Sequence, residues 1–187
     1  SIGVGEFPPP PYRSRKNLTR KQARRLSRLK RVMRNNLRRG YVTKTERMLA
    51  WKDVKRLFDR FELDQARANV AAAWYYQGKD RKAYKLATTA LARSGDKLPI
   101  SHWTAGLSAW RMKRYEQSAR HFVSLANAPG ISVWSTAGGA YWAARAYEKL
   151  GRADETRNWL RKAAEFPRTL YGVMARTRLG SPLTLES

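Results

Sequence analysis

A run of arginines between residues 20 and 39 is the first feature of this sequence whose spacing could do chemistry. Most of these arginines follow one another three or four residues apart: Arg24, Arg25, Arg28, Arg31, Arg34 and Arg38. Guanidinium groups bind carboxylates and phosphates through paired hydrogen bonds, so a helix of this kind predicts a site for an anionic partner. Alternatively, the arginines form a solvated face while the helix packs its apolar side on the domain behind it. The two hypotheses are compatible.

Residue types that support catalysis or metal binding do not cluster. The two histidines, His102 and His121, lack a metal-ligating motif, which favours a packing or surface role for each. Asp154 and Glu155 are adjacent, but they follow Gly151, where acidic residues suit the start of a helix. The sequence has no cysteine, glycine-rich phosphate loop or serine nucleophile motif. We therefore expect no catalytic residue, no metal site and no cofactor in these 187 residues.

Charge is the strongest compositional signal. The chain contains 39 Lys+Arg and 14 Asp+Glu, a formal net charge of +25. No acidic residue lies between Phe7 and Thr45, so the positive excess is greatest around the arginine run. A field of this sign attracts polyanions such as nucleic acid, anionic lipid or a charged cell-wall polymer. No apolar run is long enough to span a membrane, and the lack of cysteine excludes disulfides.

Helical periodicity runs through most of the chain. In the arginine run, the apolar residues recur at helical spacing: Leu26, Leu29, Val32, Met33 and Leu37. Thr19 is a suitable N-cap for this helix and Gly40 a suitable stop. Further helices are predicted over residues 45–61, 64–77, 81–92, 101–112, 115–126, 133–150, 154–164 and 170–179. No segment alternates with the period of two that a strand requires.

The predicted helices pair into self-similar hairpins. Small residues stand where the two helices of a hairpin would cross, at Ala71, Gly106 and Ala144, and turns are expected at Gly78, Lys113 and Gly151. These features are typical of tetratricopeptide repeats, whose hairpins gain a core by stacking on their neighbours. The predicted fold class is all-α: a right-handed superhelical stack of tetratricopeptide-like helical hairpins, an α-solenoid. Six tryptophans stand in or beside the repeat helices, and packing between the hairpins is the favoured role for most of them, the alternative being a stack that binds sugar rings or bases: Trp74, Trp103, Trp110, Trp134, Trp142 and Trp159.

Four segments make up the predicted domain organisation. Residues 1–17 form an irregular proline-rich leader, either a stiff linker or a ligand for a proline-binding partner. Residues 18–40 form the basic helix, residues 41–180 the α-superhelical repeat domain, and residues 181–187 a C-terminal tail.

Three motifs near the end of the chain are more specific than periodicity. Residues 141–151 read YWAARAYEKLG, residues 162–167 read KAAEFP and residues 169–180 read TLYGVMARTRLG. In this order they resemble the end of the superhelical region of soluble lytic transglycosylases, and the resemblance extends over residues 45–180. The resemblance implies a periplasmic, non-catalytic scaffold domain that binds or helps to remodel the peptidoglycan of the cell wall.

The same resemblance implies that the activity lies elsewhere. In that family a lysozyme-like domain follows the superhelix, and its glutamate cleaves the glycan as a carbon–oxygen lyase. We expect that domain to be absent from this chain. The terminal Glu186-Ser187 matches only two letters of the catalytic motif, so no catalytic residue is carried over.

Two other functions remain open. A tetratricopeptide-type adaptor would bind a peptide or protein in the concave groove of the stack, with the basic N-terminal helix as an anion-binding extension. Nucleic-acid binding through residues 20–39 is the least favoured, because the aromatic patterns that read RNA are missing.

Overall fold

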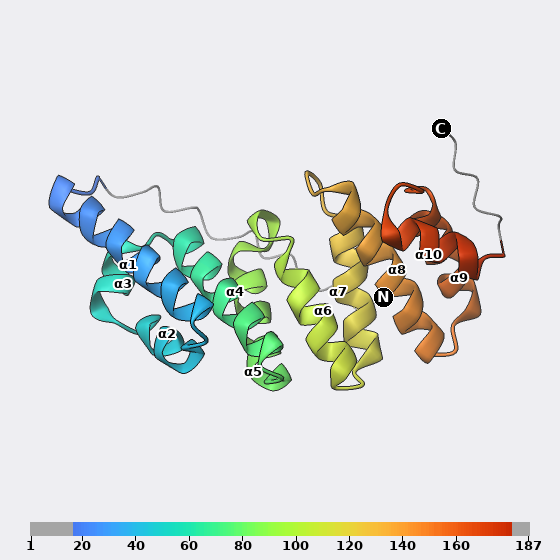
Figure 1. The fold of residues 1–187 in the computed structure, drawn as a ribbon, viewed down its shortest axis with the longest axis horizontal. Helices are drawn as coiled ribbons and strands as arrows, with labels where there is room; N and C mark the ends of the chain where they lie inside the picture. The colour runs from blue at the N-terminus through green and yellow to red at the C-terminus, as the bar shows by residue number, and fades with distance from the viewer. Residues whose placement is uncertain (1–16, 181–187) are drawn as a thin grey trace.

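Helices stacked in sequence order form the part of the chain that the structure describes (Figure 1). A computed structural model describes residues 17–180, and in that range it contains ten α-helices, one 3₁₀ helix (Gly95–Lys97) and no strand. The α-helices are α1 (Arg20–Arg38), α2 (Val42–Met48), α3 (Lys52–Leu57), α4 (Arg60–Tyr76), α5 (Asp80–Ser94), α6 (Ser101–Arg111), α7 (Tyr115–Ala126), α8 (Val133–Lys149), α9 (Ala153–Ala164) and α10 (Leu170–Arg178). Apart from residue 17, the predicted leader lies outside the described residues, and so does the predicted tail.

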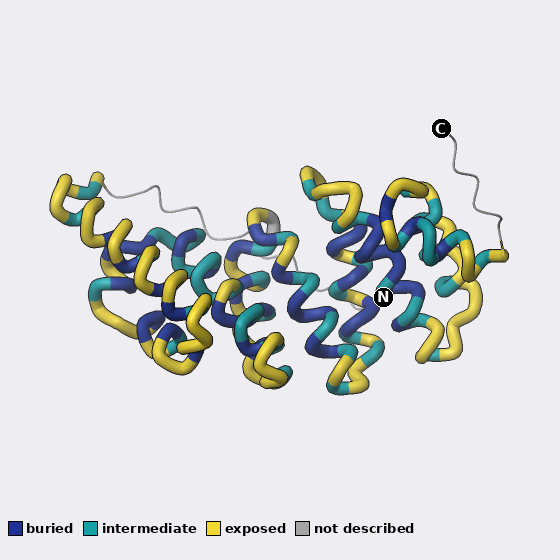
Figure 2. Tube along the Cα trace, in the orientation of Figure 1, coloured by how far each residue is buried: buried dark blue, intermediate teal, exposed yellow. Residues whose placement is uncertain are grey.

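The predicted all-α stack of helical hairpins is confirmed. Within residues 17–180, the hairpins α4/α5, α6/α7 and α8/α9 follow one another along the long axis, and α10 packs on α8 and α9 (Figure 1). Buried segments lie where neighbouring helices face one another, and exposed segments gather at the turns (Figure 2). The core is therefore distributed along the stack, as expected when each unit contacts only its neighbours. No helix between residues 17 and 180 combines the length and apolar character needed to cross a membrane.

The turns inside the hairpins occur at the predicted positions. Gly78, Lys113 and Gly151 adopt positive φ angles of 74°, 60° and 70°. Glycine adopts this left-handed conformation without strain, whereas a residue with a Cβ is disfavoured there. Lys113 is the only non-glycine residue with a positive φ in the described range. The same geometry at three sites confirms the register of the repeat.

Small residues also occupy the predicted helix crossings. Ala71, Gly106 and Ala144 are all buried. A Cβ added at Gly106 would lie 2.8 Å from the ring of Phe122 on α7. Ser118 of α7 donates a hydrogen bond from its hydroxyl to the Gly106 carbonyl at 2.9 Å. Helices α6 and α7 are thus in close contact at a position that only glycine fits.

Helix α1 begins as predicted but buries a slightly different face. Thr19 caps it, because its hydroxyl accepts a hydrogen bond from the Gln22 amide at 3.2 Å. The buried side chains of α1 are Leu26, Leu29, Met33 and Asn36. Val32, predicted to lie on the apolar face, is exposed. Asn36 is buried instead, with its side-chain amide 3.5 Å from the sulfur of Met48 on α2.

The segment after α1 differs most from the prediction. The single helix expected over residues 45–61 is wrong: the chain forms α2 and α3, separated by an extended Trp51 (φ −62°, ψ 140°). Asp59 then caps α4, since its Oδ1 accepts from the Glu62 amide at 2.7 Å while the Glu62 carboxylate accepts from the Asp59 amide at 3.0 Å. This capping box starts α4 at Arg60, earlier than the predicted start at residue 64.

A fully buried aspartate ties α4 to the end of α5. The Asp64 carboxylate accepts hydrogen bonds from the Ser94 hydroxyl at 2.7 Å, Arg93 Nε at 3.0 Å and Arg67 Nη1 at 2.5 Å. A buried carboxylate needs this pairing, because an isolated charge removed from water is strongly unfavourable. The Asp64 cluster therefore fixes the first hairpin of the repeat.

Candidate functional site

All six predicted arginines lie on the exposed surface of α1, but the structure divides them. Arg24, Arg25 and Arg28 line a cleft of about 470 Å³ beside the start of α3. Arg34 and Arg38 line a second groove, between α1 and α4. Arg31 lines neither of them, so helix α1 offers two groups of arginines and one separate arginine rather than one continuous site.

Most of this positive charge is not neutralised. Arg25 pairs with Asp53 at 3.1 Å, and Asp53 also pairs with Arg56 at 3.2 Å. None of the other five predicted arginines forms an ion pair within residues 17–180. Helix α1 itself carries no acidic residue. The binding of an anionic partner by these arginines stays a prediction, and the structure leaves five of them available for it.

The groove between α1 and α4 combines apolar and basic groups. It has a volume of about 530 Å³, within the range of binding pockets for small ligands and side chains. Its lining includes Met33 from α1 and Phe61 from α4. Lys30 reaches from α1 to pair with Glu62 of α4. Phe61 was recognisable in the sequence as part of an apolar face, but no pattern indicated that a groove would lie beside it.

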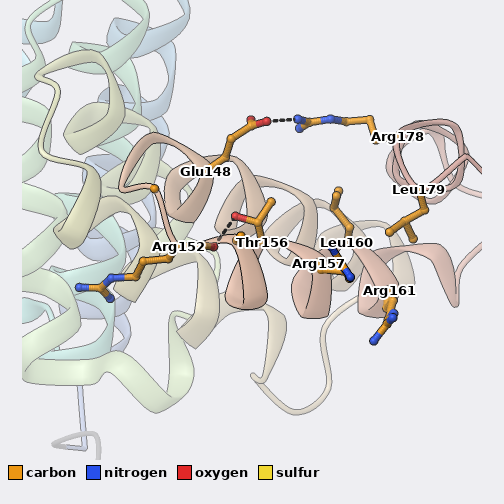
Figure 3. Close-up of a pocket in the computed structure, with 10 residues that line it drawn as sticks. Glu148, Arg152, Thr156, Arg157, Leu160, Arg161, Arg178 and Leu179 are labelled. Atoms are coloured by element: carbon orange, nitrogen blue, oxygen red, sulfur yellow. Dashed lines mark hydrogen bonds and ion pairs between the residues drawn. The ribbon is translucent and has the colours of Figure 1, made fainter.

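A second arginine-rich cleft, of about 790 Å³, lies among α8, α9 and α10 (Figure 3). Here Arg178 pairs with Glu148. Arg152 is held in an ion pair on α7 and points away from Arg157 and Arg161 (Figure 3). Because the guanidinium groups do not converge, this cleft does not form a site for a single anion.

Five of the six tryptophans assigned to packing are buried or half-buried, as predicted. The ring centre of Trp103 on α6 lies 5.8 Å from that of Phe122 and 5.9 Å from that of Tyr171, so Trp103 joins α6, α7 and α10. Trp142 of α8 stacks on Phe122 at 5.7 Å. Trp134 is the exception, because its side chain is 54% exposed at the start of α8. The aromatic rings thus serve mainly to join hairpins.

The two histidines lie side by side between α6 and α7, although no sequence motif indicated that they would be neighbours. Their Nδ1 atoms are 3.0 Å apart, and Nε2 of His121 lies 3.3 Å from the Tyr84 hydroxyl on α5. Burial lowers the pKa of both; the pKa of His121 is lowered to about 4, mainly by burial and in addition by the nearby His102 and Arg120. They are helix-packing histidines, as predicted. Within residues 17–180, no three or more His, Cys, Asp or Glu side chains are grouped to hold a metal ion.

Acid is expected to weaken the stack at this histidine pair. The unfolded chain protonates His121 near the ordinary pKa of 6.5, whereas the folded chain keeps it neutral down to about 4. The contribution of neutral His121 to the stability of the folded chain is therefore complete above pH 6.5 and is lost as the pH falls towards 4. Urea unfolding measures the free energy of unfolding at about pH 7 and at about pH 4.5. Between these two pH values, His121→Gln should lose roughly 2 kcal/mol less of this free energy than the original chain. Equal losses in the two proteins would contradict this assignment.

Together these features define the class of protein. Antiparallel helical hairpins in series, with a small residue at each crossing and a left-handed residue at each turn, form a tetratricopeptide-like helical-repeat fold. Two groups of solved structures share it. The chain is similar to a structure described as MamA MSR-1 C2, with a TM-score of 0.54 and 17% identity over 84% of this chain and 88% of that one.

The second group is a putative kinesin light chain of Podospora anserina with nearly identical TPR-like repeats. Its structure and that of a point variant give TM-scores of 0.60 and 0.62, with 17% and 16% identity. The matches cover 83% and 87% of this chain and 87% and 90% of those chains. No family model matches the sequence, and no curated protein matches it either. At these identities the likeness shows the fold alone.

The predicted relation to soluble lytic transglycosylases is therefore wrong. The similar structures are TPR-like repeat proteins, and none of the comparisons supports a role in peptidoglycan or the cell wall. Packing accounts for the residues that carried the resemblance. The ring centres of Tyr141 and Tyr171 are 5.6 Å apart, the guanidinium carbon of Arg145 lies 4.7 Å from the centre of the Trp142 ring, and Gly151 makes a turn. The periplasmic location followed from the same resemblance and stays a prediction.

Proposed function

We propose that this chain is a tetratricopeptide-type interaction adaptor that binds an acidic protein partner. The observation that carries the proposal is the exposed, unneutralised arginine surface of α1 at one end of a stack of TPR-like hairpins (Figure 1). Stacks of this kind present extended surfaces along a row of helices, which suit protein and peptide ligands. A net charge of +25 favours a partner of opposite sign and accelerates its encounter with the chain.

The placement of aromatic residues favours an acidic protein over nucleic acid. Surfaces that bind single-stranded nucleic acid combine basic groups with exposed rings on which the bases stack. Helix α1 contains no aromatic residue, Trp103 and Trp142 pack inside the stack, and the exposed rings of Tyr41 and Trp51 come after the end of α1. The α1 arginines remain suited to carboxylates, with which guanidinium groups form paired hydrogen bonds.

Selection of random peptides on the immobilised chain tests the proposal. We expect the enriched peptides to be rich in Asp and Glu, because only acidic side chains neutralise the α1 surface. Their binding should be lost when the five unpaired arginines of α1 are replaced by glutamine: Arg24, Arg28, Arg31, Arg34 and Arg38. A matched control removes five exposed basic side chains elsewhere in the stack: Lys79, Lys85, Arg114, Lys149 and Arg168.

Two results would contradict the proposal. One is an equal loss of binding in the α1 variant and the control, which would show that only the total charge matters. The other is tighter binding of a DNA duplex than of any selected peptide at moderate salt, which would favour nucleic acid as the partner.

A further inference from the structure

We infer that the groove between α1 and α4 is the docking site for an acidic amphipathic segment of the partner. Apolar side chains of that segment would fill the groove, and its carboxylates would pair with arginines on the rim. The inference rests on the proposed function and gives it a location and a ligand chemistry.

The groove exists because α1 and α4 contact each other over only a short stretch. The space beside this contact has a volume of about 530 Å³ and is lined by apolar side chains from both helices. Leu37 of α1 and Phe61 and Ala66 of α4 are only half-buried. Burying apolar surface of this kind against a ligand contributes about 25 cal/mol per Å². The lining therefore favours a ligand with large apolar side chains.

The rim of the groove specifies the charge of that ligand. Arg34 and Arg38 are one helical turn apart, are exposed, and have no ion-pair partner within residues 17–180. On the α4 side, the Gln65 amide donates a hydrogen bond to the Asn69 side chain at 3.1 Å, so this part of the rim is polar and uncharged. Carboxylates spaced by about one turn would match the two arginines.

One end of the groove is already neutral, which fixes the orientation of the charge. Lys30 pairs with Glu62, and its ammonium lies 5.9 Å from the centre of the Phe58 ring. Among the residues that line the groove, Arg34 and Arg38 are therefore the cations without a carboxylate partner. An amphipathic helix laid in the groove would place its acidic residues beside Arg34 and Arg38 and its apolar face on the floor of the groove.

A designed peptide is the probe for this inference. It is a fluorescent peptide of about 15 residues, long enough to form a helix on binding, composed of Leu, Glu and Ala with the leucines on one face. A control peptide has the same composition but scattered leucines, so its charge is unchanged. Fluorescence anisotropy with the whole chain should show tight binding of the amphipathic peptide and weak binding of the control.

Two variants locate the binding on the protein. Arg34→Glu with Arg38→Glu should weaken binding by about tenfold or more, since two charge-assisted contacts are lost. Lys79→Glu with Lys85→Glu is the matched control: the same charge change at exposed residues outside the groove and away from α1, with a loss of no more than about threefold through screened attraction. Ala66→Trp fills the groove without changing the charge and should also abolish binding, with circular dichroism to check that the helices remain.

The outcomes separate this inference from the proposed function. Equal losses in the two charge-reversal variants, unchanged binding in Ala66→Trp, or equal binding of the two peptides would overturn the groove as the site. Each of these results would leave an acidic partner intact, because binding would still depend on charge. Failure of both peptides to bind the original chain at low salt would contradict the inference and the proposed function together.

Discussion

Replacing Asp64 by asparagine is expected to lower the free energy of unfolding by about 3 kcal/mol. The carboxylate is fully buried and joins α4 to Ser94 at the end of α5, with Arg67 and Arg93 beside it. Breaking a buried ion pair from one side costs about 3–5 kcal/mol. The lower end of that range applies, because the Arg67 and Arg93 side chains are 21% and 42% exposed and can turn to water.

Asp53→Asn is the matched control for this change. Asp53 also bridges two arginines, Arg25 and Arg56, but its side chain is 33% exposed. Exposed pairs of this kind contribute only about 0–1 kcal/mol. Urea unfolding of both variants at neutral pH should therefore show a large loss at Asp64 and a small one at Asp53. Similar losses at the two positions would show that burial does not determine the strength of the cluster.

The hairpin stack could be predicted from the sequence because it depends on local chemistry. Glycine at positions 78 and 151 permits the left-handed turn, and the spacing between these two turns placed Lys113 at the middle turn although lysine is disfavoured there. The exposure of the α1 arginines follows from the helical period in the same way. Once Leu26 and Leu29 face the core, residues on the opposite side of the helix face water.

The groove could not be predicted, because it depends on where α4 lies relative to α1. That placement follows the path of the chain through the break at Trp51 and the new helix start capped by Asp59. Phe58 and Phe61 were both expected on one apolar face, and both line the groove, but Phe58 is buried whereas Phe61 is only half-buried. The pattern of apolar residues does not specify the angle at which two helices pack against each other.

The resemblance to transglycosylases failed for a related reason. Tyr141, Arg145 and Gly151 stand at spacings that helical hairpins require, whatever the protein does. The Tyr141 ring packs on Tyr171 of α10, Arg145 lies over the ring of Trp110 on α6, and Gly151 makes the turn to α9, so the motif indicates a packing arrangement. A fold shared by many proteins carries no information about activity unless a site comes with it.

Gly172→Ala is expected to destabilise the end of the stack by about 3 kcal/mol. A Cβ at this position would lie 1.9 Å from the Phe166 carbonyl oxygen, far inside contact distance. That oxygen cannot move freely, because it accepts hydrogen bonds from the Thr169 hydroxyl at 2.8 Å and from the Thr169 amide at 3.0 Å. Thr169 in turn caps α10 by accepting from the Gly172 amide at 3.0 Å. Relieving the clash therefore disrupts the cap of α10 or moves α10 away from α9.

Gly95→Ala provides the control, since it makes the same change at a site with space. Gly95 has a φ of −54° and no atom within 4 Å of the added Cβ. Its replacement should leave stability unchanged or raise it by up to about 1 kcal/mol, by restricting the unfolded chain. Hydrogen exchange should then show where Gly172→Ala acts. In a stack whose units contact only their neighbours, faster exchange should be confined to α10 and the adjoining parts of α8 and α9. Exchange that rises equally in α4 and α5 would instead show that the whole row unfolds as one unit.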